Sequence, residues 1–211
     1  MIPGPNEYFK CSKCSQIVSR GSIVSGNTFG AVLYSDGNQI APMLPKFPFL
    51  IKCRKCNTFF WLNEDNEDKE FKFPKKPPKE NDNIVKADFL TINEYQEAID
   101  TKIYLDNKEH KYIRMKLWWA YNDKLRENSN INFTEVEFEA YENNCKELIK
   151  ILDKNVLNEI LMIAELYRNI GNYEDCLEIL KTIDSENINW VKEIFKKECK
   201  KNNRKVVILR K

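Results

Sequence analysis

The 211-residue sequence contains a single histidine, His110, which lies among charged residues near an expected helix start. No Ser-His-Asp set, no phosphate-binding glycine loop and no open metal site can be assembled from the residues present. The paired acids at 64–65 and 67–68 lie in a charged, proline-containing stretch, where flexibility would spoil the geometry of acid–base chemistry. The sequence therefore favours a non-catalytic protein, and leaves open an enzyme whose residues converge only in three dimensions.

Long apolar runs are also missing. The longest, Phe47–Ile51 and Val206–Leu209, have the size of strands and fall far short of the roughly 20 residues that span a bilayer. The stretch Met1–Pro5 has neither the basic start nor the apolar segment of a secretory signal. Seven cysteines, an odd number, indicate free thiols in a reducing compartment. We expect a cytoplasmic protein that does not cross a membrane.

The net charge of +2 is unevenly distributed along the chain. Residues 1–62 contain seven lysines and arginines against Glu7 and Asp36, and the stretch 192–211 is basic as well. A basic end of this kind is compatible with an anionic partner.

The composition divides the chain into three parts. Residues 63–83 mix both charges with three prolines, which fix φ and donate no ladder hydrogen bond, so this stretch is the expected linker. Upstream, in the expected domain 1–62, segments 31–35 and 39–43 flank Asp36-Gly37-Asn38. An Asp-Gly pair predicts a β-hairpin in which both central residues take positive φ.

Downstream, in the expected domain 84–211, the apolar period changes to that of a helix. Thr91 with Glu94, Asp106 with Glu109, and Thr134 with Glu137 match the reciprocal capping box that begins a helix. The expected helices are 92–104, 107–128, 135–152, 155–170, 173–184 and 187–202. The predicted fold class is α+β, with a small β domain followed by α-helical hairpins.

Four of the cysteines form two pairs, Cys11 with Cys14 and Cys53 with Cys56, separated by 38 residues. A two-residue gap lets one tight turn aim both thiolates at one ion, and a hairpin between the pairs can bring the turns together. The expected cofactor is one structural Zn²⁺ in a closed tetrahedron of four sulfurs, with iron as the alternative occupant. A redox pair is disfavoured, because it would not require two pairs and a closed site leaves no position for a substrate.

Asn57 follows the second pair and suits the left-handed conformation of such turns, whereas Ser15 after the first pair fits less well. The four cysteines and the hairpin resemble a zinc ribbon, in which two turns at hairpin tips share one zinc ion. The sequence of residues 25–38 and 41–50, followed by the aromatic run Phe59-Phe60-Trp61, is similar to an uncharacterised bacterial family that places such a ribbon before a helical region. For these aromatics we expect alternating burial rather than stacking on bases.

The stretch 164–180 resembles a tetratricopeptide repeat of about 34 residues. The matching positions carry Ala164, Tyr167, Gly171, Tyr173, Cys176 and Leu180. The resemblance implies an αα-hairpin in which Gly171 ends the first helix and Asn172 caps the second. One repeat cannot bury its own faces, so we expect a degenerate partner pair over 113–152, and Trp190, Ile194 and Phe195 at the other end.

The remaining motifs have ordinary interpretations. Trp118 and Trp119 are expected to pack in the core or between domains rather than to recognise a ligand. Cys145, Cys176 and Cys199 are well separated along predicted helices and are expected to be small buried hydrophobes. For His110 we expect a solvated position.

Two functions follow as hypotheses. The first is an adaptor that binds a protein or peptide through its helical hairpins, with the zinc-stapled unit orienting that surface. The alternative is a nucleic-acid-binding regulatory protein whose ribbon places basic side chains on phosphates. The candidate residues for this role are Lys10, Lys13, Arg20, Lys52, Arg54 and Lys55.

Overall fold

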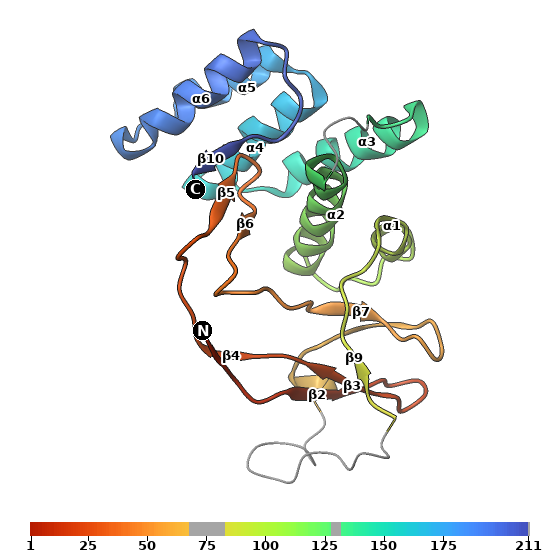
Figure 1. Cartoon of the computed structure of the whole chain (residues 1–211). Coiled ribbons are helices and arrows are strands. Elements are labelled where there is room, and N and C mark those ends of the chain that lie inside the picture. The colour runs from red at the N-terminus through yellow and green to blue at the C-terminus, as the bar shows by residue number, and fades with distance from the viewer. Residues whose placement is uncertain (68–82, 128–131, 211) are drawn as a thin grey trace. The chain divides into compact units, whose positions relative to one another are not determined.

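The computed structural model describes residues 1–67, 83–127 and 132–210, and it divides into two compact units. The first unit comprises Met1–Gly30 and Ile40–Glu94, and the second comprises Ala31–Gln39 and Tyr95–Lys211. Strands dominate the first unit and helices the second, which confirms the α+β class (Figure 1). Most of the expected linker, residues 68–82, lies outside the described residues.

The first unit is built from short strands in three small sheets. β2 pairs antiparallel with β3, and β9 joins β3 in parallel, while β7 pairs with β8 and β1 with β4. The bounds are β1 (Ile2–Pro3), β2 (Glu7–Lys10), β3 (Ile17–Arg20), β4 (Ile23–Ser25), β7 (Leu50–Lys52), β8 (Phe59–Trp61), the 3₁₀ turn η1 (Glu64–Asn66) and β9 (Val85–Lys86).

The core of this unit is small. It combines apolar side chains of β2, β3, β7 and β8 with two cysteines: Phe9, Cys11, Val18, Ile51, Cys53, Phe60, Leu62 and Ala87. In β8 only Phe60 is fully buried, and Phe59 and Trp61 on the opposite side of the strand are half-buried, which confirms the alternation predicted for these aromatics.

Six α-helices occur in the described residues, and each begins and ends within four residues of the bounds that the sequence predicts. Their bounds are α1 (Ile92–Asp100), α2 (Asn107–Glu127), α3 (Glu135–Ile151), α4 (Leu157–Ile170), α5 (Tyr173–Thr182) and, after the 3₁₀ turn η3 (Glu186–Ile188), α6 (Asn189–Lys200).

The capping boxes set the helix starts. Thr91 with Glu94 and Thr134 with Glu137 exchange both side-chain-to-backbone bonds, as predicted. Asp106 accepts from the backbone N–H of Glu109, but the Glu109 carboxylate reaches back to Leu105 rather than to Asp106. In the box of Asp106 and Glu109, the bond from the glutamate carboxylate is therefore made to the residue before the cap instead of to the cap itself.

The α4–α5 hairpin turns at Gly171, whose φ of 88° ends α4 in the left-handed conformation, as predicted. Ala164, Cys176 and Leu180 are buried between the two helices, together with Phe195 of α6. Two expectations were wrong. Asn172 makes no side-chain cap bond, because its amide turns to Asp175, and Trp190 is 44% exposed instead of closing the end of the cluster.

The predicted hairpin forms from β5 (Val32–Tyr34) and β6 (Gln39–Ile40), and the C-terminal strand β10 (Ile208–Arg210) pairs with β5 on its other side. Only Gly37 at the tip takes positive φ, at 71°, so the turn is not the one predicted with two such residues. Residues 31–39 belong to the helical unit, whereas the sequence placed them in the domain 1–62.

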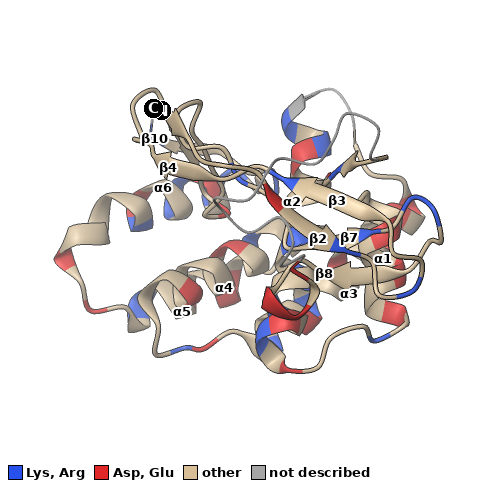
Figure 2. Cartoon of the chain, turned by 90° about the horizontal axis from the view of Figure 1, so that it is seen from below, with Lys and Arg blue, Asp and Glu red and all other residues tan. Residues whose placement is uncertain are grey.

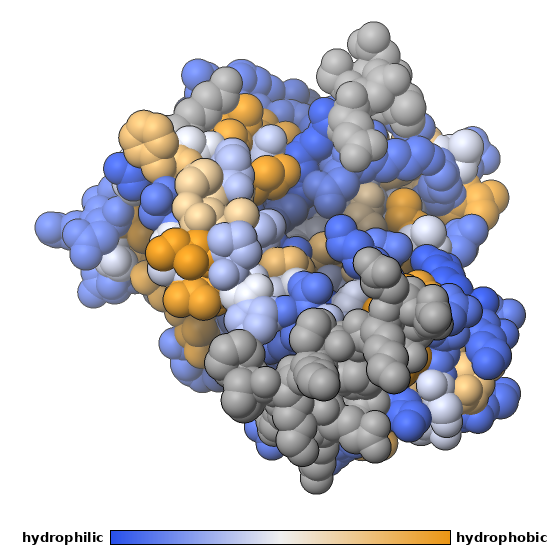
Figure 3. Space-filling view, turned by 60° about the horizontal axis from the view of Figure 1, so that its bottom comes forward, coloured by the Kyte–Doolittle hydropathy of each residue, from blue (hydrophilic) through white to orange (hydrophobic). Residues whose placement is uncertain are grey.

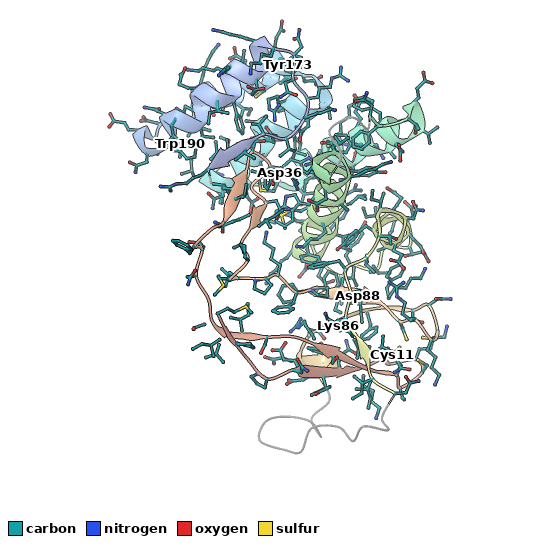
Figure 4. The ribbon with its side chains drawn as sticks, viewed as in Figure 1. Cys11, Asp36, Lys86, Asp88, Tyr173 and Trp190 are labelled. Atoms are coloured by element: carbon teal, nitrogen blue, oxygen red, sulfur yellow. The ribbon has the colours of Figure 1, made fainter. Side chains whose placement is uncertain are left out.

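Asp36 at the hairpin tip is fully buried in the second unit (Figure 4). Its Oδ2 accepts from Asn122 Nδ2 at 2.9 Å and from Arg126 Nη1 at 2.8 Å, and its backbone oxygen accepts from Trp119 Nε1 at 3.1 Å. These three partners come from α2. The hairpin tip is therefore held to α2 by a charge pair and two further hydrogen bonds.

A second buried pair joins the hairpin to α4. Glu165 and Arg168 are both 0% exposed, and Arg168 Nε donates to Glu165 Oε2 at 2.8 Å. Ser35 donates to Glu165 Oε1 at 2.6 Å, and Arg168 also donates to backbone oxygens of Asn203 and Lys205. The pair thus connects the hairpin, α4 and the segment before β10 in one network.

The core predictions for the second unit are largely confirmed. Trp118 and the cysteines at 145, 176 and 199 are buried, but Cys176 and Cys199 are not separate, because their sulfurs lie 3.6 Å apart. His110 is half-buried rather than solvated: it stacks on Tyr104 with centroids 3.9 Å apart and accepts from Arg114. No helix in the described ranges has the length and apolar character needed to cross a bilayer.

The buried Asp36 predicts a specific pH dependence. Burial raises its pKa to about 6 from 3.8, against the opposing effect of Arg126. Between about pH 4 and 6 the folded chain then binds more protons than the unfolded chain, so the contribution of Asp36 to the free energy of unfolding declines as the pH rises through this window, by on the order of 2–3 kcal/mol. Urea unfolding should show Asp36→Asn gaining that amount relative to wild type between pH 4 and 7. The exposed control Asp184→Asn should run parallel to wild type, and a parallel curve for Asp36→Asn would contradict the prediction.

The Glu165–Arg168 pair predicts a large stability loss. Glu165→Ala leaves a buried guanidinium without its counter-charge, which costs about 3–5 kcal/mol of the free energy of unfolding. Glu178→Ala is the matched control, since Glu178 pairs with Lys181 at the same helical spacing but with 70% of its side chain exposed, and should cost less than about 1 kcal/mol. Equal losses in the two variants, measured by denaturant unfolding, would refute the assigned role.

Candidate metal centre

Two turns of nearly identical backbone geometry carry the four cysteines. In the first, after β2, Ser15 N–H donates to Cys11 O at 2.9 Å and Cys11 N–H donates to Gln16 O at 3.0 Å. In the second, after β7, Asn57 donates to Cys53 O and Cys53 to Thr58 O, both at 2.8 Å. Each turn therefore closes a hairpin, β2–β3 or β7–β8, at its tip.

The residue after each pair takes the left-handed conformation. Asn57 has φ of 58°, as predicted, and Ser15 has the same φ of 58° although its side chain is less suited to that region. The hydrogen bonds of the turn hold Ser15 there. The equivalence of the two turns is thus a property of the backbone rather than of the residue type.

The turns bring the four sulfurs into one cluster (Figure 4 labels Cys11). Cys11 Sγ lies 3.6 Å from Cys56 Sγ, and Cys14 Sγ lies 3.6 Å from Cys53 Sγ. All four ligand atoms lie within 4.8 Å of one another. All seven cysteines fall in the described residues, and none forms a disulfide.

These distances fit a single metal ion. Four sulfurs placed tetrahedrally at 2.3 Å from zinc would be about 3.8 Å apart, close to the separations observed. Cys11 and Cys53 are buried in the core, whereas Cys14 and Cys56 are half-buried at its edge. A metal ion held by all four would be coordinatively closed, so the arrangement suits a structural role.

The thiols differ in acidity. Burial raises the pKa of Cys11. A backbone N–H of Gln16 favours the Cys14 thiolate, but burial and the neighbouring thiols outweigh it and raise the pKa of Cys14 to about 12. The hydroxyl and backbone N–H of Thr58 lower the pKa of Cys56 to about 6. Cys56 is therefore the cysteine most readily present as a thiolate, the form that binds a cation. A bound cation would replace the protons on the neighbouring thiols.

Thr58 was missed by sequence reasoning. Its hydroxyl lies 3.4 Å from Cys56 Sγ, and its backbone oxygen closes the second turn. Its place two residues after the second pair, directly before β8, is the signal that could have identified it.

The basic residues predicted for nucleic acid divide into two groups. Arg20 pairs with Glu7 at 2.8 Å and lies between the rings of Phe9 and Phe49, and Arg54 pairs with Glu94 at 2.6 Å. Lys52 lies over the ring of Phe59. The exposed remainder is Lys10, Lys13 and Lys55, and Figure 2 shows basic segments around the turns that follow β2 and β7.

Comparison of the chain with protein families, with curated proteins and with solved structures gives no match.

The cluster predicts metal binding that depends on each turn. We expect one metal ion per purified chain and a lower metal content in Cys11→Ser and Cys53→Ser, since each change opens the tetrahedron. Inductively coupled plasma mass spectrometry against protein concentration measures this. Cys145→Ala, which alters a buried cysteine of α3 outside the cluster, should keep its metal, and full retention in both serine variants would disprove the site.

Proposed function

We propose that this chain is a zinc-binding adaptor that binds another protein or peptide, and that its metal has a structural rather than a catalytic role. Zinc is preferred to iron because it is the common occupant of four-thiolate structural sites and has no redox chemistry. The metal analysis described above separates the two, since an iron–thiolate centre would also colour the protein.

The observation that carries the adaptor proposal is an exposed group of apolar side chains on the first unit. β1 pairs with β4, and Gly26 beyond β4 lies against Met43 and Leu44. The exposed fractions are 46% for Met1, 58% for Ile2, 68% for Val24, 36% for Met43 and 40% for Leu44. We call these five residues the apolar patch.

Contiguous exposed apolar surface is uncommon on monomeric soluble proteins and marks sites of interaction. Hydrophobic side chains gather in the left part of Figure 3, over the β1–β4 ribbon. A ribbon of two and three residues cannot hold such a surface in place by itself, so the metal-stapled core beside it would supply the rigidity. The zinc ion would thus affect partner binding indirectly, by stabilising the fold that holds the apolar patch in place.

The helical unit supports the same proposal in a second way. α4 and α5 form a hairpin with a glycine turn and buried small residues, and repeated helical hairpins serve as binding scaffolds. We propose that it contributes a further contact surface.

A nucleic-acid partner has weaker support. Of the six basic residues proposed for it, Arg20 and Arg54 are already held by acids of the first unit. Three exposed lysines would contact few phosphates, whereas non-specific binding depends on the number of phosphates neutralised.

The adaptor proposal is tested by affinity purification from native cells, first with nucleic acid retained and then after nuclease treatment. We expect a protein partner that survives nuclease treatment and is lost in Val24→Asp/Leu44→Asp, because charges in the patch oppose its burial. Leu105→Asp and Val136→Asp, exposed apolar positions of the second unit, are the matched controls.

Both controls should retain the partner. A partner released by nuclease would favour the nucleic-acid alternative, and retention by the double aspartate variant would overturn the role of the patch.

A further inference from the structure

A cavity of about 280 Å³ opens within the second unit, between α2, α3, α4 and the segment before β10. Its apolar walls come from Leu125 of α2, from Phe133 just before α3, and from Phe138 and Tyr141 of α3. The rest of its described lining is polar: Asn132, Asn169, Arg204 and Lys205. The volume lies just below the range of about 300–1,000 Å³ typical of small-molecule sites, which leaves room for a ligand with one ring.

The aromatic wall is fixed. The Tyr141 ring lies 5.0 Å from Phe133 and 6.4 Å from Phe138, centre to centre. Its hydroxyl donates to Asn122 at 2.9 Å and accepts from Trp118 at 3.2 Å. Because the hydroxyl already donates one hydrogen bond and accepts another, Tyr141 presents its ring face to the cavity and not its oxygen.

Asn169, which also lines the cavity, is similarly occupied. Its amide nitrogen donates to Glu165 Oε1 at 3.2 Å and to the backbone oxygen of Arg204 at 2.7 Å, and its oxygen accepts from Trp118 at 3.0 Å. The amide of Asn169 is therefore used in hydrogen bonds within the protein. Polar contacts to a ligand would come from residues at the rim of the cavity.

Arg204 supplies that rim. Its guanidinium carbon lies 5.1 Å from the centre of the Phe138 ring, and it rests against Gly171, where an added Cβ would come within 2.8 Å of Nε. Among the described residues this guanidinium makes no hydrogen bond or ion pair. Lys205 lines the same cavity, and none of the described lining residues is acidic.

We propose that this cavity binds a carboxylate that carries one apolar or aromatic group. The carboxylate would take a bidentate position on Arg204, and the apolar group would lie against Phe133, Phe138 and Tyr141. A free aromatic acid and the carboxyl-terminal residue of a peptide share this chemistry. The site lies in the second unit and depends on neither the metal nor the apolar patch.

The test is calorimetric titration of the full, metal-loaded chain with 3-phenylpropionate, with its neutral amide, and with a short peptide ending in phenylalanine that has a free or amidated terminus. We expect saturable binding of the acid, of the free-terminus peptide or of both, and at least about tenfold weaker binding of the amide forms, since the charge-assisted bonds are lost. Which of the two binds identifies the source. No binding of either carboxylate at millimolar concentration, or equal binding of acids and amides, overturns the proposal.

Arg204→Met removes the charge and keeps an apolar stem over Phe138, so it should weaken carboxylate binding at least about tenfold. Arg210→Met is the same change in the exposed part of β10, outside the cavity, and should bind like wild type. Phe138→Leu, which keeps an apolar wall of smaller area, should weaken the acid and its amide alike. Unchanged binding in Arg204→Met, with an unchanged circular dichroism spectrum, would refute the assignment.

Discussion

Four sulfur atoms held within 4.8 Å of one another are the constraint on which the first unit depends. Its strands are two to four residues long, and two-stranded ribbons of that size are marginal in water. The two cysteine turns each close one ribbon. The ribbons are joined by the sulfur cluster, by a few apolar side chains, by hydrogen bonds from Arg20 to the backbone oxygens of Pro48 and Leu62, and by a bridge between Phe9 and Glu67. A cation among the sulfurs would replace protons that burial retains on Cys11 and Cys14, and its binding would then contribute to the folding of this unit.

The second unit depends on a different device, the burial of paired charges. Asp36 meets Arg126 of α2, and Glu165 meets Arg168 under the Ser35 hydroxyl. Such pairs add little net stability over apolar packing, but they penalise any arrangement that separates them. Residues 31–39, which lie in the interval between the cysteine pairs, belong to this helical unit and account for part of the long spacing.

What could be predicted from the sequence was local. The cysteine pairs, the Thr134 capping box and the Gly171 turn each depend on residues within a few positions, so their patterns are visible in the chain. The pairing of Asp36 with Arg126 joins residues 90 positions apart, and Asp36 looked like an ordinary turn residue. For the same reason the contact of Cys176 with Cys199, and the exposure of Trp190, could not be read from helical spacing.

Gly171 has two structural roles, and only the first, the end of α4, could be predicted from the local sequence. Its positive φ ends α4, and this is the reason that a glycine is expected there. The missing side chain also leaves the space in which the Arg204 guanidinium rests, beside the ring of Phe138. A side chain at 171 would therefore disturb both the helix end and the cationic rim of the cavity. The turn that defines the helical hairpin is thus also what places a charge over the apolar pocket.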